Sequence, residues 1–349
     1  MLRHQPLRSR LSVLVLGVCC WSLSPFLPAA QPTEDGNAEQ TARIEMLIQK
    51  LGHESYATRE KAQAELARMG LAAFDALLAA QEADDVEVAL RAKYLVRGMN
   101  VGWVREDDPQ EVKAILRGYE AASVEHRRSI LDRLAMEDQY HGTEALCRLA
   151  RFETHEVLSK KAALLVMLQD IPDDETAKEE YLTSVSNAVR FSRRTAADWL
   201  RTYVETMQGK EGSLAKLDAL TRSEQELFGL TPDESSQDIL GGLLLWQAGM
   251  LRERGQQQQA FDVIVRRLDM LDEGRVEVME TIDWLIHRQA WSLIDEINKR
   301  FAARFGGDAE FLYRLAEARM KQSRVEVAET LAKRAFDVKK DDAAEHERL

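Results

Sequence analysis

Apolar residues recur along most of this chain at three- and four-residue intervals, the spacing of a helix face, and short polar breaks separate the runs. Two such faces open the pattern: Ile44, Leu47, Ile48 and Leu51 form the first, and Ala62, Leu66 and Met69 form the second. Gly52–Ser55 separates the two faces, and Gly70 ends the second. These segments predict two antiparallel helices joined by a short turn.

The same plan continues through the first two thirds of the chain. Further helix pairs are expected at residues 74–78 with 88–96, 109–121 with 124–136, 142–152 with 155–169, and 174–190 with 193–207. Gln208–Ser213 and Gly229–Asp233 then interrupt the apolar spacing, and a single helix is expected between them. The chain therefore reads as a succession of helix hairpins.

A 34-residue period organises the last third. Ala260, Ile294 and Ala328 fall in register, and so do the preceding turn residues Gly255, Gln289 and Ser323. Self-similarity at this period indicates a stack of two-helix units, each of which needs its neighbours to bury its apolar face.

The first half resembles HEAT repeats. A Leu-x-x-Leu helix and a short turn precede Arg59, Ala62 and Leu66, which stand at the family's spacing before Gly70. Glu87, Arg91 and Leu95 form a looser second copy. The resemblance covers residues 44–207, and an irregular α-solenoid is the alternative.

Residues 213–349 resemble tetratricopeptide (TPR) repeats, which alternate large and small positions over 34 residues. The first copy carries Leu244, Ala248, Leu251, Gly255, Ala260, Ile264 and Leu268 at the family's offsets. The middle copy departs from the pattern, because Ile282 and Ile294 replace the two small alanines. The expected fold is all-α: an α-solenoid of antiparallel helix hairpins, HEAT-like followed by TPR-like.

Residues 1–30 are typical of a signal peptide. Arg3, Arg8 and Arg10 precede an apolar run over residues 11–23, and cleavage is expected near Ala29 or Ala30. Residues 31–42 are polar and are expected to form a disordered tether. We therefore expect an exported protein of bacterial type, located in the periplasm or cell envelope. The alternative is that residues 11–23 stay uncleaved as an inner-membrane anchor.

Charge narrows the class of partner. The formal net charge is −12, and removal of the three signal arginines makes it −15. Such an acidic chain is a poor candidate for binding nucleic acid, and membrane contact is expected only if the signal is uncleaved. Cys147 is the one cysteine outside the signal, and its apolar neighbours predict a core residue.

Sequence patterns for catalysis and cofactor binding are missing, so no cofactor or metal is expected. The histidines lack metal-ligand spacing, and there is no glycine-rich phosphate loop. Acidic pairs such as Asp84-Asp85, Asp107-Asp108 and Asp173-Asp174 stand at expected helix starts, where they are predicted to cap helices.

The TPR resemblance implies that the first helix of each repeat lines a concave groove. The positions that it assigns to this groove are Leu245, Gly249, Arg252, Met279, Asp283, Ile286, Tyr313, Glu317 and Met320. Such a mixed surface suits a protein or peptide partner, although Leu245, Ile286 and Met320 could instead pack internally.

The leading hypothesis is thus a non-enzymatic scaffold that binds a partner in this groove. Two alternatives stay open: an envelope enzyme or enzyme subunit built on a helical toroid, and a cell-wall glycan binder. The second would use Trp103, Tyr140 and Trp199, whose apolar neighbours instead favour positions in the core.

Overall fold

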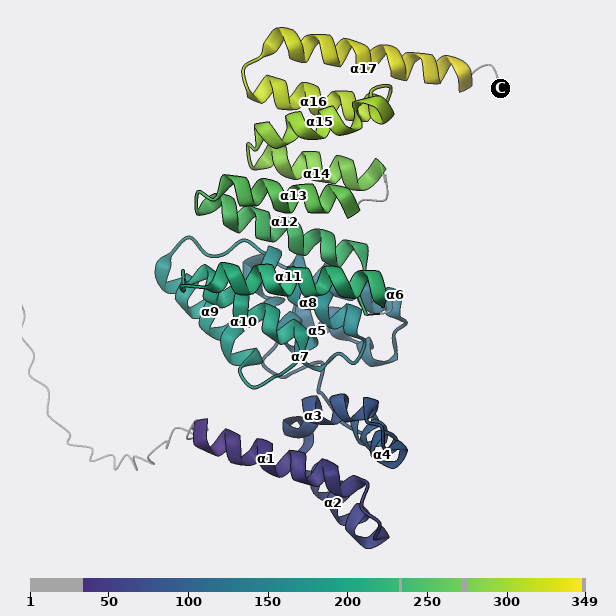
Figure 1. Ribbon diagram of the computed structural model, residues 1–349, viewed down its shortest axis with the longest axis vertical. Helices are drawn as coiled ribbons and strands as arrows, with labels where there is room; N and C mark the ends of the chain where they lie inside the picture. The colour runs from purple at the N-terminus through teal and green to yellow at the C-terminus, as the bar shows by residue number, and fades with distance from the viewer. Residues whose placement is uncertain (1–33, 232–233, 271–274, 347–349) are drawn as a thin grey trace, which may run out of the picture.

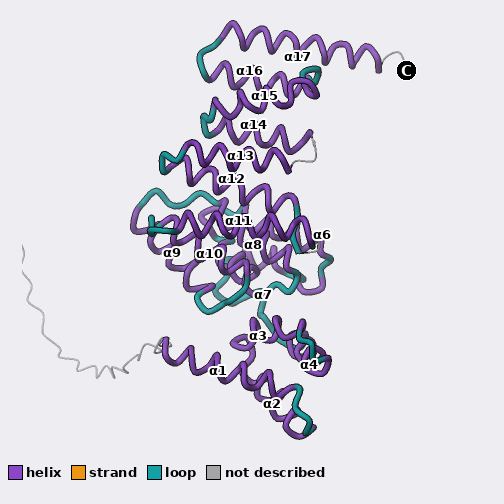
Figure 2. Tube along the Cα trace, in the orientation of Figure 1, coloured by secondary structure: helices purple, strands orange, loops and turns teal. Residues whose placement is uncertain are grey.

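The computed structural model describes residues 34–231, 234–270 and 275–346, and every regular element within them is helical (Figures 1 and 2). The prediction of an all-α chain is confirmed. The expected signal peptide, residues 1–30, and residues 31–33 lie outside the described residues. Among the described helices, none combines the length and apolar character that crossing a bilayer requires.

Four helices form an N-terminal unit at one end of the molecule (Figure 1): α1 (Glu34–Leu51), α2 (Tyr56–Met69), α3 (Phe74–Ala79) and α4 (Val86–Arg97). Helix α1 begins within the expected tether, so the prediction of disorder is wrong for residues 34–42. Glu39 and Gln40 there are exposed but favour helix, and the buried residues Ile44, Leu47 and Leu51 fix the continuation of the same helix.

Six helices form the central part: α5 (Gln110–Leu116), α6 (Val124–Ala135), α7 (Thr143–Phe152), α8 (Glu156–Leu168), α9 (Glu175–Val189) and α10 (Thr195–Met207). Their positions agree with the expected pairs, except that α5 is shorter than predicted. Gly118 adopts φ +80°, a left-handed conformation that stops the helix, and a 3₁₀ turn at Tyr119–Ala121 follows.

The remaining helices stack towards the far end (Figure 1): α11 (Ser213–Leu230), α12 (Gln237–Glu253), α13 (Gln257–Met270), α14 (Arg275–His287), α15 (Trp291–Phe305), α16 (Ala309–Lys321) and α17 (Val325–His346). In this stack the helices pack as pairs, α12 with α13, α14 with α15 and α16 with α17. Contacts between helices two apart, such as α14 with α16, join successive pairs.

The 34-residue period has a backbone counterpart. Gly255, Gln289 and Ser323 all adopt left-handed φ values, of 74°, 55° and 61°. After each of them, a backbone N–H donates to a carbonyl oxygen five residues earlier: Gln256 to Leu251, Ala290 to Leu285 and Arg324 to Arg319, at 2.8–2.9 Å. This bond is the mark of a Schellman turn, so three successive hairpins turn by one geometry although only one has glycine there.

The buried apolar residues form three clusters. The N-terminal unit has its own cluster, which Phe152 of α7 joins by an edge contact with Phe74, with ring centroids 5.3 Å apart. A central cluster extends from α5 to α12, and a C-terminal cluster from α12 to α16. Helix α12 belongs to both, since Leu243 and Trp246 lie in the central cluster while Leu244 and Ala248 lie in the C-terminal one.

Two ion pairs are buried between distant parts of the chain. The Lys160 ammonium of α8 lies 2.8 Å from a carboxylate oxygen of Glu224 on α11, and their side chains are 1% and 2% exposed. Arg148 of α7 is paired with Asp108 at 2.7 Å. The prediction that the Asp107-Asp108 pair caps a helix is therefore wrong for Asp108, whereas Asp85 and Asp174 accept N–H bonds at the starts of α4 and α9 as expected.

Candidate functional site

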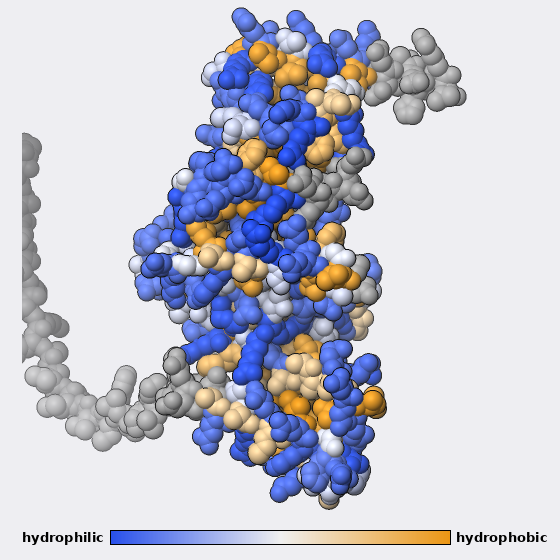
Figure 3. All heavy atoms as spheres, in the orientation of Figure 1, coloured by the Kyte–Doolittle hydropathy of each residue, from blue (hydrophilic) through white to orange (hydrophobic). Residues whose placement is uncertain are grey.

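Part of the expected groove is present on α16 as an open, mixed surface. Tyr313, Glu317 and Met320 follow one another at four- and three-residue steps along this helix, and all three are exposed. The fractional exposure is 47% for Tyr313 and 51% for Met320, which is high for side chains of this size and apolar character. In Figure 3, apolar residues lie among hydrophilic ones at the end of the molecule where α16 and α17 lie.

These three residues border a cavity of about 570 Å³ between α14, α16 and α17. Asp283 of α14 lines it as well, so four of the nine expected positions meet in one hollow. Ala316 on α16 and Ala328 and Ala332 on α17 also line it. Because alanines are short, they leave room for the side chain of a partner between the two helices. We refer to this hollow as the α16–α17 cavity.

One arginine, Arg314, pairs with two carboxylates at the cavity. Arg314 donates two hydrogen bonds to Asp283, at 2.7 and 2.9 Å, and a third to Glu310 at 2.7 Å. These bonds, that to Asp283 foremost, raise the pKa of the Arg314 guanidinium. Glu317 pairs with Lys321 at 2.9 Å. Among the lining residues, three carboxylates face a single cation, so the rim is acidic.

Sequence reasoning did not assign Arg314, Ala328 or Ala332 to the groove, although it identified Ala328 as a repeat position. Arg314 follows Tyr313 directly and is 34 residues from Glu280, so the repeat period gives no hint of its role. The two alanines belong to the second helix of their hairpin, whereas the family resemblance directs attention to first helices. The four-residue spacing of these alanines was the signal that could have revealed them.

The other expected groove residues do not continue this surface. Met279 and Ile286 are 3% and 4% exposed in the C-terminal cluster, because they share the apolar stripe of α14 with Ile282. Leu245 packs against the same cluster, and Gly249 is buried. These four residues are therefore closed to a partner, and internal packing, the alternative considered for Leu245 and Ile286, is what the structure shows.

Arg252 is half-buried, and its guanidinium is hydrogen-bonded within the fold. Its guanidinium donates to the backbone carbonyl of Arg288 at 2.6 Å. Burial, and next the nearby charge of Arg288, lower its pKa. Arg252 thus links α12 to the end of α14 and does not line the α16–α17 cavity.

The aromatic residues considered for glycan binding are core residues. Trp199 is 1% exposed. Trp103 packs against Tyr119 and Tyr140 against Tyr181, with ring centroids 5.1 and 5.3 Å apart. The expectation that these residues belong to the core is confirmed: Trp199 is buried, and Trp103 and Tyr140 are partly buried and pack against the central cluster.

Cys147 is 1% exposed in the central cluster, as predicted, and burial raises its pKa to about 12. Over the described part of the chain, no group of three or more His, Cys, Asp or Glu side chains is placed to hold a metal ion.

Comparisons of the chain with protein-family models, with curated proteins and with solved structures give no significant match.

Proposed function

We propose that this chain is a non-enzymatic scaffold that binds a protein or peptide partner in the α16–α17 cavity. The observation that carries the proposal is the convergence of Asp283, Tyr313, Glu317 and Met320 on one hollow, since the TPR resemblance had selected these positions before any contact was known. Exposed Met and Tyr side chains next to small residues are characteristic of surfaces that adapt to a peptide.

The architecture proposed with this function is an α-solenoid, HEAT-like over residues 44–207 and TPR-like over residues 213–349. Two features support it. Helices pack against their neighbours in chain order and against the helix two positions on, as stacked hairpins do. The three Schellman turns at Gly255, Gln289 and Ser323 also repeat at the TPR period.

The chemistry of the cavity defines the partner segment. Its alanine-lined floor and exposed Tyr313 and Met320 suit one or two apolar side chains. Its acidic rim favours lysine or arginine beside them and disfavours a segment that carries acidic residues. We propose a short segment of this kind on an exported protein, because residues 1–30 resemble a signal peptide and so favour a location in the periplasm or cell envelope.

A selection from a random peptide library displayed on phage tests the proposal. The full chain is the target, and selected peptides are then compared on two variants with the same chemical change. Met320→Glu places a charge in the cavity. Met136→Glu, the control, makes the same change at a residue that is 82% exposed and does not line the cavity.

We expect peptides that combine apolar and basic residues, that bind the wild type and Met136→Glu alike, and that lose affinity for Met320→Glu by about tenfold or more. Circular dichroism of both variants checks that the helices remain. The proposal is refuted if no peptide is enriched, or if the enriched peptides bind Met320→Glu as well as they bind the wild type.

A further inference from the structure

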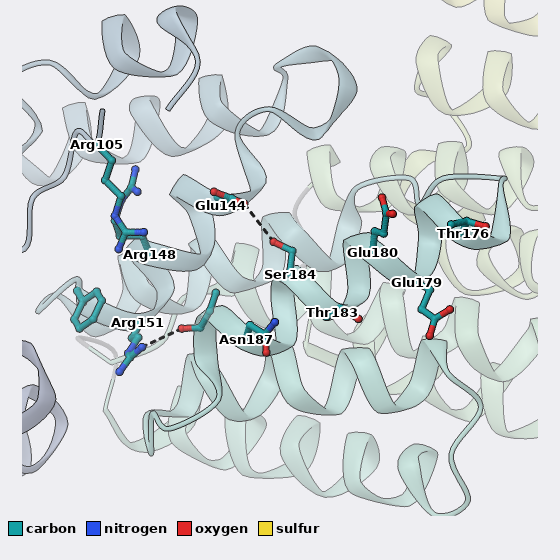
Figure 4. A pocket seen from close by; sticks show the side chains of 12 residues that line it. Arg105, Glu144, Arg148, Arg151, Thr176, Glu179, Glu180, Thr183, Ser184 and Asn187 are labelled. Atoms are coloured by element: carbon teal, nitrogen blue, oxygen red, sulfur yellow. Dashed lines mark hydrogen bonds between the residues drawn. The ribbon is translucent and has the colours of Figure 1, made fainter. Parts of the chain in front are cut away.

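A second cavity, of about 890 Å³, lies between α7 and α9, in the central part of the molecule and separate from the α16–α17 cavity. Glu144, Arg148 and Arg151 project into it from α7, and Arg105 reaches it from the segment between α4 and α5 (Figure 4). A polar stripe of α9 forms the opposite wall, made up of Thr176, Glu179, Glu180, Thr183, Ser184 and Asn187.

Charge is divided between the two ends of this cavity. Figure 4 shows Arg105, Arg148 and Arg151 gathered at one end, with Arg105 and Arg148 pointing towards one another, while Glu179 and Glu180 lie at the other end. Ser184, which donates to Glu144 at 3.4 Å, lies between them. Like charges this close repel each other unless an anion lies among them.

The buried arginine of this group lacks acceptors. Arg148 is only 4% exposed, and its Nη2 donates to both oxygens of Asp108, at 2.7 and 3.0 Å. In the described part of the chain, its Nε and Nη1 have no hydrogen-bond partner. Unpaired N–H groups of a buried cation carry a desolvation cost that an added acceptor would remove.

Arg151, one turn further along α7, also has a buried N–H group without an acceptor among the described residues. Its Nη1 donates to the Ala188 carbonyl oxygen at 3.2 Å, while its buried Nε has no partner among the residues that the structure describes. Burial lowers the pKa of Arg151, the charge of Arg105 lowers it further, and Asp75 opposes this effect. The arginine end therefore has cationic donors that the Asp108 carboxylate and the Ala188 carbonyl leave unsatisfied.

We propose that this cavity binds a short peptide with a free C-terminal carboxylate, which lies among Arg105, Arg148 and Arg151. The opposite end determines the rest of the ligand, because Glu179 and Glu180 suit an ammonium group. Arg151 contacts Ala188, so the arginine end lies beside the end of α9, and eight residues of helix separate Ala188 from Glu180. That is about 12 Å along the helix, the span of about four extended residues.

Arg105 is the residue best suited to test this site. It is exposed, its side chain makes no hydrogen bond or ion pair with another described residue, and it points towards Arg148 at the arginine end of the cavity. Arg117, at the end of α5, is equally exposed and does not line the cavity, so Arg117→Ala is a matched control. Arg148 is a poor choice because its loss leaves Asp108 buried without its partner.

The experiment is calorimetric titration of the full chain with four probes: tetra-alanine, its C-terminal amide, its N-acetylated form and inorganic phosphate. We expect tetra-alanine to bind, and C-terminal amidation or Arg105→Ala to weaken binding by about ten- to hundredfold, because each removes charged hydrogen bonds. N-acetylation weakens binding by a smaller factor, and Arg117→Ala leaves it unchanged. Met320→Glu also leaves it unchanged, which separates this site from the proposed function.

Three outcomes overturn the proposal: no binding of tetra-alanine at about 1 mM, equal binding of the free and amidated peptides, or full affinity in Arg105→Ala. Phosphate binding that equals tetra-alanine binding and depends on Arg105 overturns the assignment to peptides and indicates an oxyanion of another source. Arg105→Lys, which keeps the charge but not the two-pronged donor, provides a second variant if the alanine substitution disturbs folding.

Discussion

The ion pair between Lys160 and Glu224 offers the sharpest test of how the central helices are joined. Both side chains are nearly inaccessible, and the Lys160 ammonium also donates to the Glu234 carbonyl oxygen at 2.8 Å. Glu224 accepts a further bond from the Ser235 hydroxyl. The pair therefore connects α8, α11 and the segment that leads into α12.

The substitution Lys160→Met keeps the length of the side chain and removes its charge. Glu224 is then a buried carboxylate whose one remaining side-chain donor is Ser235, so we expect the free energy of unfolding to fall by about 3–5 kcal/mol. The double variant Lys160→Met with Glu224→Leu leaves no buried charge at this place. We expect it to lie within about 1 kcal/mol of the wild type, or above it, since apolar packing replaces the pair.

The adjacent lysine gives a matched control. Lys161 pairs with Asp132 at 2.7 Å, but the Asp132 side chain is 43% exposed, so Lys161→Met should cost about 0–1 kcal/mol. Urea unfolding followed by far-ultraviolet circular dichroism measures all four chains. The reasoning fails if Lys160→Met costs no more than Lys161→Met, or if the double variant is as unstable as the single one.

Two other predictions concern the repeat turns and the buried thiol. Gln289→Gly and Ser323→Gly should each raise the free energy of unfolding by about 0.5–1 kcal/mol, because glycine adopts the left-handed conformation without strain. Gly255→Ala should lower it by a similar amount. The shared turn geometry is contradicted if either substitution to glycine lowers the free energy of unfolding, or if Gly255→Ala raises it. Cys147 should resist thiol reagents in the folded chain from about pH 7 to 9, because burial raises its pKa to about 12, and should react once urea unfolds the protein. Mass spectrometry of the peptide that carries Cys147 reads this out, and rapid labelling of the folded chain that rises with pH would refute it.

Helix positions were predictable from the sequence because apolar spacing and turn residues act locally. The 34-residue register identified Gly255, Gln289 and Ser323 as equivalent turn residues, but the left-handed backbone of Gln289 and Ser323, which lack the usual glycine, was not predicted. The start of α1 was missed because its first turns are polar and receive their stability from the apolar residues that follow in the same helix.

The polar interior was not predictable. Arg148 lies in a run of buried residues whose spacing gives no sign that it is paired with Asp108, 40 positions earlier. The same holds for Lys160 and Glu224, which come from different helix pairs. In the expected groove, Met279 and Tyr313 occupy the same position of the 34-residue repeat, but Met279 is buried and Tyr313 is exposed. The repeat period relates equivalent positions and does not predict how exposed each of them is.

Because α12 contributes to two buried clusters, it determines which helices unfold together. Unfolding the C-terminal stack exposes Leu244 and Ala248, and a helix lost there also removes Leu243 and Trp246 from the central cluster. Helices α5 to α16 are therefore coupled as one cooperative block, in the way that neighbouring repeats share interface energy. The N-terminal unit shares only Phe152 with the central helices in its buried cluster, so it can open first while the rest stays folded.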